Sequence, residues 1–553
     1  MDGSTSSLEP QSSGAEDMGI SLGDLFNSMG RGVFAGKAAF AQATPRLMTF
    51  CTIYALGSIF FGYDGASFGG VQAMDPFMKT FGKWNETKEA YYLPSDLQSL
   101  MNSLPLIGKF LGTIIVGPII ERFGHRYTMA FTCCIQVVGP ITVSFPLKFK
   151  SRAKFRLNSL LGDFWSTQQS VVPTYQSEIA PGALRGFFVG SIQLCLTTGS
   201  LIAGIVNESM SRKTGNSGWQ IATALQALPA VMILCLLFFT PNSPRWLIFN
   251  DRYEEALKVL RSVRRQQDVD NGLPELELAS MREEGQAGKR EKGPWKDLIN
   301  RENRRRTGIA CAIMTFQQLT GVTFSSSYGP TFYRSVGLSD MAFIYAVVNN
   351  ATSVVTAMMA MVFLDMFGRR TLVVHGGWSQ GAFLISIAAL GRIKNPNVNE
   401  SNGIVAGMQL YTCILHMTLG PGAYITAAEV GTQALREKTM AVSTALNVLV
   451  GFVVVFCTPY LLREIGSGLA YIWGGFAILS SIWAWFCMPE LKGRNLEEID
   501  QLFEANIPAW HFSKYQTGGL THELAVLENR ETPGKKVDEE ADIDVSRVEN
   551  ARP

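Results

Sequence analysis

The sequence lacks the spacings of cysteine and histidine that disulfide frameworks and metal sites require. Its nine cysteines are scattered through apolar stretches without paired spacing, and its five histidines show no ligand pattern. This excludes a disulfide framework and a zinc site, and no cofactor or metal is expected. A nucleophile–base pair and a nucleotide-binding loop are also missing, so no enzyme activity is expected. The net charge of +2 says little about partners. We expect no nucleic-acid partner, and no protein partner can be named.

The N-terminus has no targeting signal of the cleaved type. It is rich in serine and glycine but has neither the basic start nor the apolar core of a signal peptide. Residues 1–46 are therefore predicted to be a disordered cytoplasmic tail.

Charged residues are scarce, at 17% of the chain, and hydrophobic residues reach 47% in long runs. A bilayer core about 30 Å thick needs about 20 apolar residues per helix. On that basis we predict twelve spans, at 47–71, 96–120, 127–147, 157–178, 186–207, 219–240, 307–332, 341–364, 371–391, 403–427, 439–462 and 467–488. The predicted fold is an all-α membrane protein with two pseudo-symmetric bundles of six helices.

A polar stretch divides the spans into two sets of six. The predicted domains are an N-terminal half at 47–240, a cytoplasmic helical linker at 241–306, a C-terminal half at 307–488 and a cytoplasmic tail at 489–553. Within the linker, residues 253–260 have a helical pattern.

Basic loops fix the predicted orientation. Short loops rich in lysine and arginine all fall on the side of the linker, which the positive-inside rule makes cytoplasmic. Three glycosylation sequons, at Asn85, Asn207 and Asn399, fall on the opposite side. These asparagines are candidate glycosylation sites, and the outward sequons favour the plasma membrane.

The two halves repeat each other. The segment from Glu121 to Arg126 is echoed by the segment from Asp365 to Arg370, and Glu178 and Glu429 each stand seven residues before an arginine. Parallel repeats are a transporter architecture in which the substrate site lies between the halves.

Five motifs, in order, carry a resemblance to the sugar porter branch of the major facilitator superfamily. They are Gly117-x-x-x-Glu121-Arg122-x-Gly124-His125-Arg126, Gln176-Ser-Glu178 with Arg185-Gly, Pro241-Asn-Ser-Pro-Arg245-Trp, Gln317-Gln318-Leu-Thr-Gly321 and Pro489-Glu-Leu-Lys-Gly493-Arg. The chain resembles fungal-type hexose and disaccharide carriers from about residue 61 to residue 499. The resemblance implies the major facilitator fold, a small-molecule sugar as cargo, alternating access, and either sugar–proton symport or facilitated diffusion.

The resemblance also implies sugar-binding positions. A ring of hydroxyl groups needs amide side chains, which both donate and accept hydrogen bonds. Gln193, Gln317, Gln318 and Asn447 fall where the family places such amides, and Tyr424 stands where many relatives have tryptophan. The alternative interpretation is that these amides only bond between helices.

Two positions depart from the family pattern. Thr323 stands where the family has a sugar-contacting asparagine, and in span eight the matching position is Ser353, with Asn349 one turn away on the same face. These differences predict a pocket unlike that of well-known glucose carriers, and the sequence does not name the sugar.

Charged residues at the cytoplasmic ends of the spans are predicted to form a gate. They pair acidic with basic positions in both halves: Glu121 with Arg122, Glu178 with Arg185, Asp365 with Arg369 and Arg370, and Glu429 with Arg436. Such pairs would hold the outward-open state and separate when the halves rock. The alternative is that the basic residues only set the topology.

Asp64 in span one matches the family's proton-site carboxylate. An ionised carboxylate is costly inside the bilayer and marks a functional position by default, so Asp64 is predicted to couple the sugar to a proton. The alternative is a structural hydrogen bond to a neighbouring helix. Lys109 in span two is a second charge at depth, and the sequence assigns it no specific role.

Residues 148–169 break the family pattern. They carry five basic residues on the outer side, and the family arginine that pairs with the span-one acid falls near Asn158, with Arg156 the nearest arginine. This is either a real divergence or an error in this part of the sequence.

Two other functions remain open at this point. One is a sugar sensor that binds its ligand without transporting it. The other is a carrier of a quinate-like hydroxy acid, whose negative charge would favour Lys109 as its cationic contact.

Overall fold

The structure, a computed structural model, is a bundle of membrane-length helices with a small hairpin at one end. It describes residues 43–86, 89–144, 168–213, 215–279, 281–282, 294–301, 303–338, 341–393, 397–432, 435–492, 496–505 and 507–512. The basic segment at 148–156 and the tails beyond these ranges therefore lie outside the described residues.

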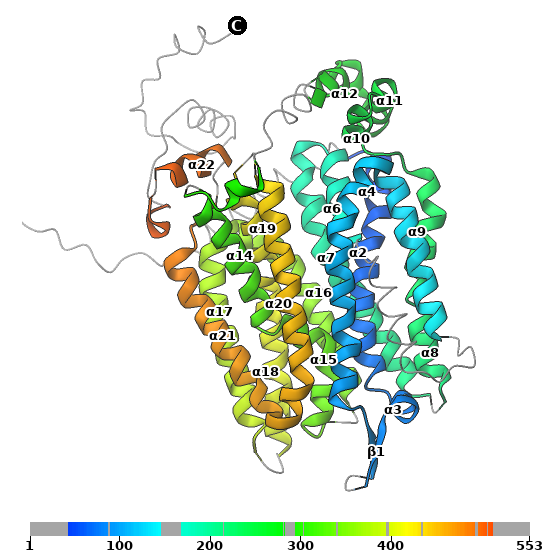
Figure 1. Ribbon diagram of the computed structural model, residues 1–553, viewed down its shortest axis with the longest axis vertical. Helices are drawn as coiled ribbons and strands as arrows, with labels where there is room; N and C mark the ends of the chain where they lie inside the picture. Colours follow the sequence, from blue (N-terminus) through cyan, green and yellow to red (C-terminus); the bar gives the residue numbers. More distant parts are fainter. Residues whose placement is uncertain are drawn as a thin grey trace, which may run out of the picture.

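Two groups of helices stand side by side in Figure 1, with α2 to α9 in one and α14 to α21 in the other. The first group comprises α2 (Pro45–Val71), α4 (Ser95–Ser144), α6 (Gln168–Ile179), α7 (Gly182–Ser211), α8 (Ser217–Ala224), α9 (Ala227–Leu236) and η1 (Leu237–Phe239). The second comprises α14 (Arg304–Leu319), α15 (Val322–Ser335), α16 (Ala342–Phe367), α17 (Arg369–Leu390), α18 (Val398–Met417), α19 (Leu419–Val430), α20 (Arg436–Ile465), η3 (Gly466–Gly468) and α21 (Leu469–Cys487).

The two ends of the bundle carry different elements (Figure 1). One end, called here the linker end, holds α10 (Pro244–Phe249), α11 (Tyr253–Val263), α12 (Gln266–Asp270), η2 (Trp295–Leu298), α22 (Leu496–Glu504) and η4 (Ala509–His511). The other, the hairpin end, holds α3 (Asp75–Phe81) and the antiparallel strands β1 (Lys83–Asn85) and β2 (Ala90–Tyr92). The helix predicted within the linker is confirmed as α11. The hairpin was not predicted, because each strand is only three residues long.

Six helical stretches are long and apolar enough to cross a bilayer alone, within the described residues. They are 45–71, 217–239, 342–361, 369–390, 398–430 and 438–487, and a bent pair within α4 adds a seventh. The last stretch contains both α20 and α21, which η3 joins. The remaining predicted spans are shorter, broken or more polar.

Two spans of the second group are broken inside the bundle. Gly321 has φ +88° and separates α14 from α15, and Thr418 separates α18 from α19. Non-helical backbone at membrane depth is tolerated only where the protein satisfies its polar groups. The Tyr411 hydroxyl donates to the Thr320 carbonyl at 2.8 Å, and the Gln380 amide donates to the Thr418 hydroxyl at 3.1 Å. A neighbouring helix thereby bonds the backbone at the first break and the side chain of Thr418 at the second.

Close approach of backbones holds α2 against α7. A Cβ at Gly62 would lie 1.9 Å from the Leu196 carbonyl oxygen, and one at Gly199 would lie 2.0 Å from the Ile59 carbonyl oxygen. Small residues at helix interfaces permit this approach in membranes. Glycine is therefore required at both positions.

We expect Gly199→Ala to destabilise the protein by about 1–3 kcal/mol or more, because the methyl group must displace the α2 backbone. The melting temperature and the monodisperse fraction of the purified protein measure this effect. Gly475→Ala is the matched control, since a Cβ there meets nothing within 4 Å, and it should leave both values unchanged or raised. A Gly199→Ala protein as stable as the control would contradict the packing.

Candidate functional site

A cavity of about 220 Å³ lies between the two groups of helices. Its wall comes from α2, α4 and α8 on one side and from α15 and α20 on the other. The polar members of this wall are Asp64, Asn102, Lys109, Gln136, Thr223, Gln226, Thr323, Ser326 and Ser327, and the apolar ones include Phe60, Phe61 and Phe68. Polar groups with aromatic faces beside them are typical of a pocket for a small polar ligand.

An ion pair forms part of the cavity wall. Lys109 Nζ lies 3.0 Å from Asp64 Oδ2 and donates a hydrogen bond to it. The side chains are 13% and 16% exposed, respectively. Charges at membrane depth are almost always paired with one another, so this contact lets both residues face the cavity at reduced cost.

The predicted amides of spans seven and eleven form one buried network. Asn447 Nδ2 donates to Gln317 Oε1 at 2.9 Å, and Gln318 Nε2 donates to Asn447 Oδ1 at 3.0 Å. Gln317 Nε2 in turn donates to the Gly420 carbonyl at 2.7 Å, just after the break at Thr418. The structure therefore brings these three residues together, and each also bonds between helices as the alternative interpretation states.

Three residues of the predicted sugar site keep a buried oxygen without a hydrogen-bond partner among the described residues. They are Gln318 (Oε1), Thr323 (Oγ1) and Asn349 (Oδ1). Thr323 lines the cavity. Buried polar atoms are nearly always paired in native proteins, and an unpaired one calls for a ligand, a water or an ion.

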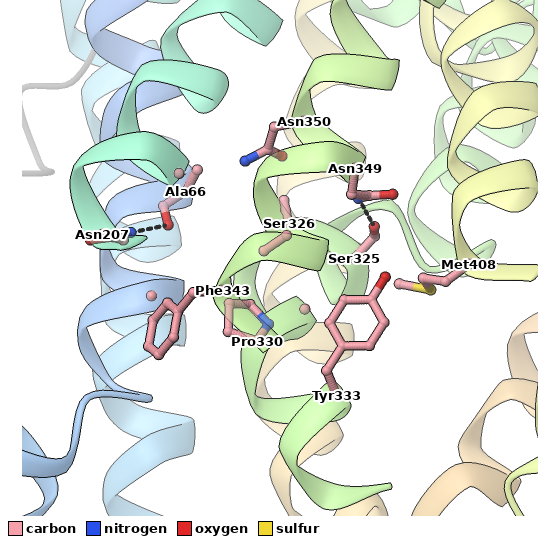
Figure 2. Close-up of a pocket in the computed structure, with 14 residues that line it drawn as sticks. Ala66, Asn207, Ser325, Ser326, Pro330, Tyr333, Phe343, Asn349, Asn350 and Met408 are labelled. Atoms are coloured by element: carbon pink, nitrogen blue, oxygen red, sulfur yellow. Dashed lines mark hydrogen bonds between the residues drawn. The ribbon is translucent and has the colours of Figure 1, made fainter. Parts of the chain in front are cut away.

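Asn349 lies in a second, smaller space of about 20 Å³, which is room for about one water molecule. Figure 2 shows Asn349 pointing to Ser325, to which its amide donates at 3.4 Å. Ser353 is buried and donates to the Asn349 carbonyl. The large cavity therefore contains Thr323 but neither of these two predicted residues.

The other two predicted sugar residues stand apart from the cavity wall. Gln193 is partly buried on α7, and Tyr424 of α19 packs against the apolar core of the second group. Sequence reasoning missed Asn102, Gln136 and Gln226, which do line the cavity. The sequence could have indicated these three residues, because each is an uncharged polar residue inside an otherwise apolar stretch.

Contacts between the two groups of helices gather toward the hairpin end. Gln72 Nε2 donates to the Ser327 carbonyl at 2.7 Å, and Asn350 Nδ2 donates to the Ser200 carbonyl at 3.0 Å. An ion pair joins Arg334 to Asp75 at 2.9 Å. Among the described residues, the Gln72 bond and the Arg334 ion pair thus lie toward the hairpin end, whereas the Asn350 bond is level with the cavity, because Ser200 also bonds to Gly62 beside the cavity wall.

At the linker end, the repeated motif forms the same turn twice. Gly124 and Gly368 occupy equivalent motif positions, with φ +81° and +87°. A carboxylate or amide then caps the next helix: Asn242 Oδ1 accepts from the Arg126 N–H, and Glu490 accepts from the N–H groups of Arg369 and Arg370. The signatures after spans six and twelve therefore serve as helix caps for these turns.

The residues predicted to form a gate are only partly brought together. Arg369 Nη2 lies 3.1 Å from Glu429 Oε1. In the other half, Glu178 has His125 at 3.7 Å as its partner and accepts a hydrogen bond from the Ser243 hydroxyl. Each cluster lies within a single half of the protein, so it holds spans of that half together.

The remaining described residues of the predicted gate lie on the surface or at the start of helices. Glu121 and Arg122 are exposed, and Arg122 stacks on the Phe123 ring at 5.5 Å. Arg436 is the first residue of α20 and Arg370 is the second residue of α17, and the Arg370 side chain donates to the Trp485 carbonyl at 2.6 Å. The side chains of Arg185 and Asp365 lie outside the described residues.

The expectation of a glycan at Asn207 is wrong. Asn207 is 3% exposed within α7, and its amide donates to the Ser67 carbonyl at 3.0 Å. Figure 2 shows the side chain turned toward Ala66 inside the bundle. The three residues match the motif for N-glycosylation, but helix packing buries the side-chain nitrogen of Asn207 to which a glycan would be attached. Asn399 is exposed at the start of α18, and Asn85 lies in β1.

Residues 50–503 match the family model described as "Sugar (and other) transporter". This match spans most of the chain. The chain belongs to the sugar (and other) transporter family. The resemblance seen in its five motifs is thereby confirmed.

Curated relatives of this transporter cover most of its length. It is 28% identical to "Sugar transport protein 4" of Arabidopsis thaliana over 489 residues, which is 86% of this chain and 93% of the relative. It is 27% identical to "Probable high-affinity hexose transporter ght7" of Schizosaccharomyces pombe, over 82% of this chain and 90% of the relative.

Solved structures with the same fold include the xylose transporter XylE from E. coli in an inward-open conformation. The TM-score is 0.68 at 22% sequence identity, over 82% of this chain and 99% of that one. A partially occluded inward-open form of XylE gives a TM-score of 0.66. The transporter therefore has the predicted major facilitator fold, with two pseudo-symmetric bundles of six spans.

We expect Asn447→Ala to lower the stability of this transporter, because Gln317 and Gln318 lose the partner that satisfies their buried amides. Each unsatisfied group costs about 1–3 kcal/mol, so the melting temperature of the purified protein should fall clearly. Asn402→Ala, at an exposed position on α18, is the control and should change stability by less than about 0.5 kcal/mol. Equal melting temperatures for the two variants would argue against the network.

Proposed function

We propose that this transporter carries a sugar across the membrane by alternating access, and that it is a sugar–proton symporter. The observation that supports the cargo is the polar wall of the cavity, where Thr323 Oγ1 is buried without a hydrogen-bond partner among the described residues and the amides of Asn102 and Gln226 stand beside aromatic rings. A sugar hydroxyl donates and accepts hydrogen bonds and would bond to these groups. The printed names of the Arabidopsis and fission-yeast relatives, a sugar transport protein and a hexose transporter, point to the same class.

The neutral balance of the cavity favours a sugar over a hydroxy acid. Lys109 is the one cation among the described residues of the cavity wall, and its ammonium group is bonded to Asp64. A carboxylate ligand would have to compete with a carboxylate that is already in place. Catalytic activity is not part of this proposal, and a non-transporting sensor is separated from a transporter by the uptake assay below.

We assign the linker end to the cytoplasm and the hairpin end to the outside, in the plasma membrane. The basic loops lie at the linker end, and Asn399 is exposed at the other. Because Gln72 and Arg334 join the halves toward the hairpin end, the structure corresponds in this orientation to an inward-facing state. The charged clusters at Glu178 and Glu429 would then close as a cytoplasmic gate in the opposite state.

Uptake of labelled glucose, xylose and maltose into cells that lack their own carriers tests the transport itself. We expect uptake of at least one sugar and its loss on adding a proton uncoupler. Asp64→Asn should abolish accumulation because the side chain can no longer bind and release a proton. Uptake indifferent to the uncoupler and to Asp64→Asn would indicate a facilitator. Absence of uptake by protein that reaches the membrane would favour a sensor or another cargo.

Glycan mapping tests the orientation. We expect Asn399→Gln, Asn85→Gln or both to remove a glycan that an endoglycosidase also removes, visible as a shift in electrophoretic mobility. Asn207→Gln should cause no such shift, because Asn207 is buried. A glycan on Asn207, or a native protein with none on Asn85 and Asn399, would contradict the placement.

A further inference from the structure

Gln72 lies at the end of α2, where the two groups of helices meet toward the hairpin end. It is 2% exposed and follows Val71, the last residue of α2. Its Oε1 accepts from Gln98 Nε2 at 3.2 Å and from Asn102 Nδ2 at 2.9 Å, whereas its Nε2 donates to the Ser327 carbonyl at 2.7 Å. Gln98 and Asn102 belong to α4 and Ser327 belongs to α15. The buried Gln72 amide therefore bonds to both groups of helices.

The two amides of α4 decide which end of the Gln72 amide faces α15. Both Gln98 and Asn102 present an N–H group to the same oxygen. A reversed Gln72 amide would place its own N–H groups against these two donors and its oxygen against the Ser327 carbonyl. It would lose all three bonds, and unpaired polar groups are costly when buried. The orientation that donates to α15 is therefore fixed by α4.

The backbone of α2 touches α15 at the same place. A Cβ at Gly69 would lie 2.7 Å from the Ser327 carbonyl oxygen and 3.0 Å from the Ser326 carbonyl oxygen. Ser99 of α4 also donates to the Phe456 carbonyl of α20 at 2.5 Å. These contacts cross between the two groups, so they require the groups to be closed against each other at this level.

Asn102 connects the Gln72 contact to the cavity. The side chain of Asn102 is part of the cavity wall. Its amide nitrogen donates to Gln72 and also to the Gln98 carbonyl at 2.8 Å, which uses both of its hydrogens. Within the described part of the chain, its Oδ1 is the atom left for a hydroxyl group of a sugar. A sugar bonded to Asn102 would hold in place the amide that orients Gln72.

We propose that Gln72 is a positioning residue for alternating access, which holds α15 against α2 when the hairpin end is closed and joins this closure to the sugar through Asn102. This inference rests on the proposed function, because it names a residue for one conformational step of that function. When the groups part at the hairpin end, the bond to Ser327 must break. The bonds to α4 can remain, since α2 and α4 belong to the same group.

Hydrogen–deuterium exchange of the purified full-length protein in lipid nanodiscs measures the closure without any sugar. Peptides covering residues 66–74 and 325–335 report on the hairpin end. Peptides covering residues 120–128 and 304–312 report on the linker end. A shift between inward-facing and outward-open states changes deuterium uptake at the two ends in opposite directions.

Gln72→Met should raise deuterium uptake at the hairpin end and lower it at the linker end. Loss of one hydrogen bond should shift the equilibrium toward the outward-open state by about two- to tenfold. Gly69→Ala should shift uptake in the same direction, because its methyl group would meet the backbone of α15.

Gln409→Met is the matched control. The Gln409 amide donates to the Tyr345 carbonyl at 3.1 Å, and both residues lie in the second group of helices. This variant loses a similar bond that does not cross between the groups. It should raise uptake near α16 and α18 and lower it at neither end.

Gln72→Glu tests the donated hydrogen bond. The introduced carboxylate can still accept from Gln98 and Asn102, but it has no hydrogen to donate to the Ser327 carbonyl. When the carboxyl group is protonated, its O–H group can donate there. Deuterium uptake should therefore lie closer to the native pattern at pH 5 than at pH 8, with the native protein measured at the same pH in each case.

Sugar exchange tests the link through Asn102, with whichever of glucose, xylose or maltose the native protein carries best. Added sugar should lower uptake at the hairpin end of the native protein, and Gln72→Met should lose this response. In liposomes at equal pH on both sides, Gln72→Met should exchange labelled for unlabelled sugar about two- to tenfold more slowly, whereas Gln409→Met should match the native rate.

Three outcomes would overturn the inference while leaving sugar transport intact. One is a Gln72→Met protein with native uptake at both ends, or with a rise at the hairpin end and no fall at the linker end. Another is a Gln72→Glu protein that shows no recovery at pH 5. The third is a response to sugar that survives in Gln72→Met. Failure of the native protein to exchange any of the three sugars would instead overturn the proposed function, and deuterium uptake without sugar would still decide whether Gln72 holds the closure.

Discussion

Inside a bilayer there is no water to satisfy a charge or a broken backbone, so every such group must find its partner within the protein. That constraint accounts for the arrangement around the cavity. Asp64 and Lys109 face it only because they neutralise each other. At the break beside Gly321 a side chain of another helix bonds the freed Thr320 carbonyl, and at the second break Gln380 bonds the Thr418 hydroxyl. The positions of the polar groups around the cavity therefore depend on how the helices pack.

The repeat also shows how two unlike sequences reach one geometry. Each half turns at a glycine with a left-handed backbone, and each caps the following helix with a polar side chain from the signature that ends the half. An asparagine does this in the first half and a glutamate in the second. The acidic residue of span four or ten lies beside the residue after the glycine, which is His125 at 3.7 Å in one half and Arg369 at 3.1 Å in the other. The two clusters are alike in position, but the basic partner of the glutamate is a histidine in the first half and an arginine in the second.

The spans, the linker helix and the repeat could be predicted because they depend on hydrophobic length, charge bias and helical periodicity, all of which are local. The contact between Lys109 and Asp64 could not, since it joins positions 45 residues apart on helices whose rotation the sequence leaves open. Asn207 was misjudged for a related reason. A sequon is read from three consecutive residues, whereas its accessibility depends on α2, which packs over it. The amides of spans seven and eleven could be found as polar residues at depth, but the bonds among them depend on how the helices pack and could not be predicted.

The docking of the C-terminal segment has a practical consequence for anyone who shortens or tags the chain. Leu502, Phe503 and Phe512 pack with Ile309 and Val430 at the linker end. Arg305 donates to the Ile507 carbonyl at 2.8 Å, and Arg306 stacks on the Phe503 ring. A truncation before residue 496 would expose this apolar patch to solvent and remove these contacts of Arg305 and Arg306. A fluorescent protein fused beyond residue 512 would leave the apolar patch covered. The last 41 positions of the chain, 513–553, are therefore the better place for a truncation or a fusion.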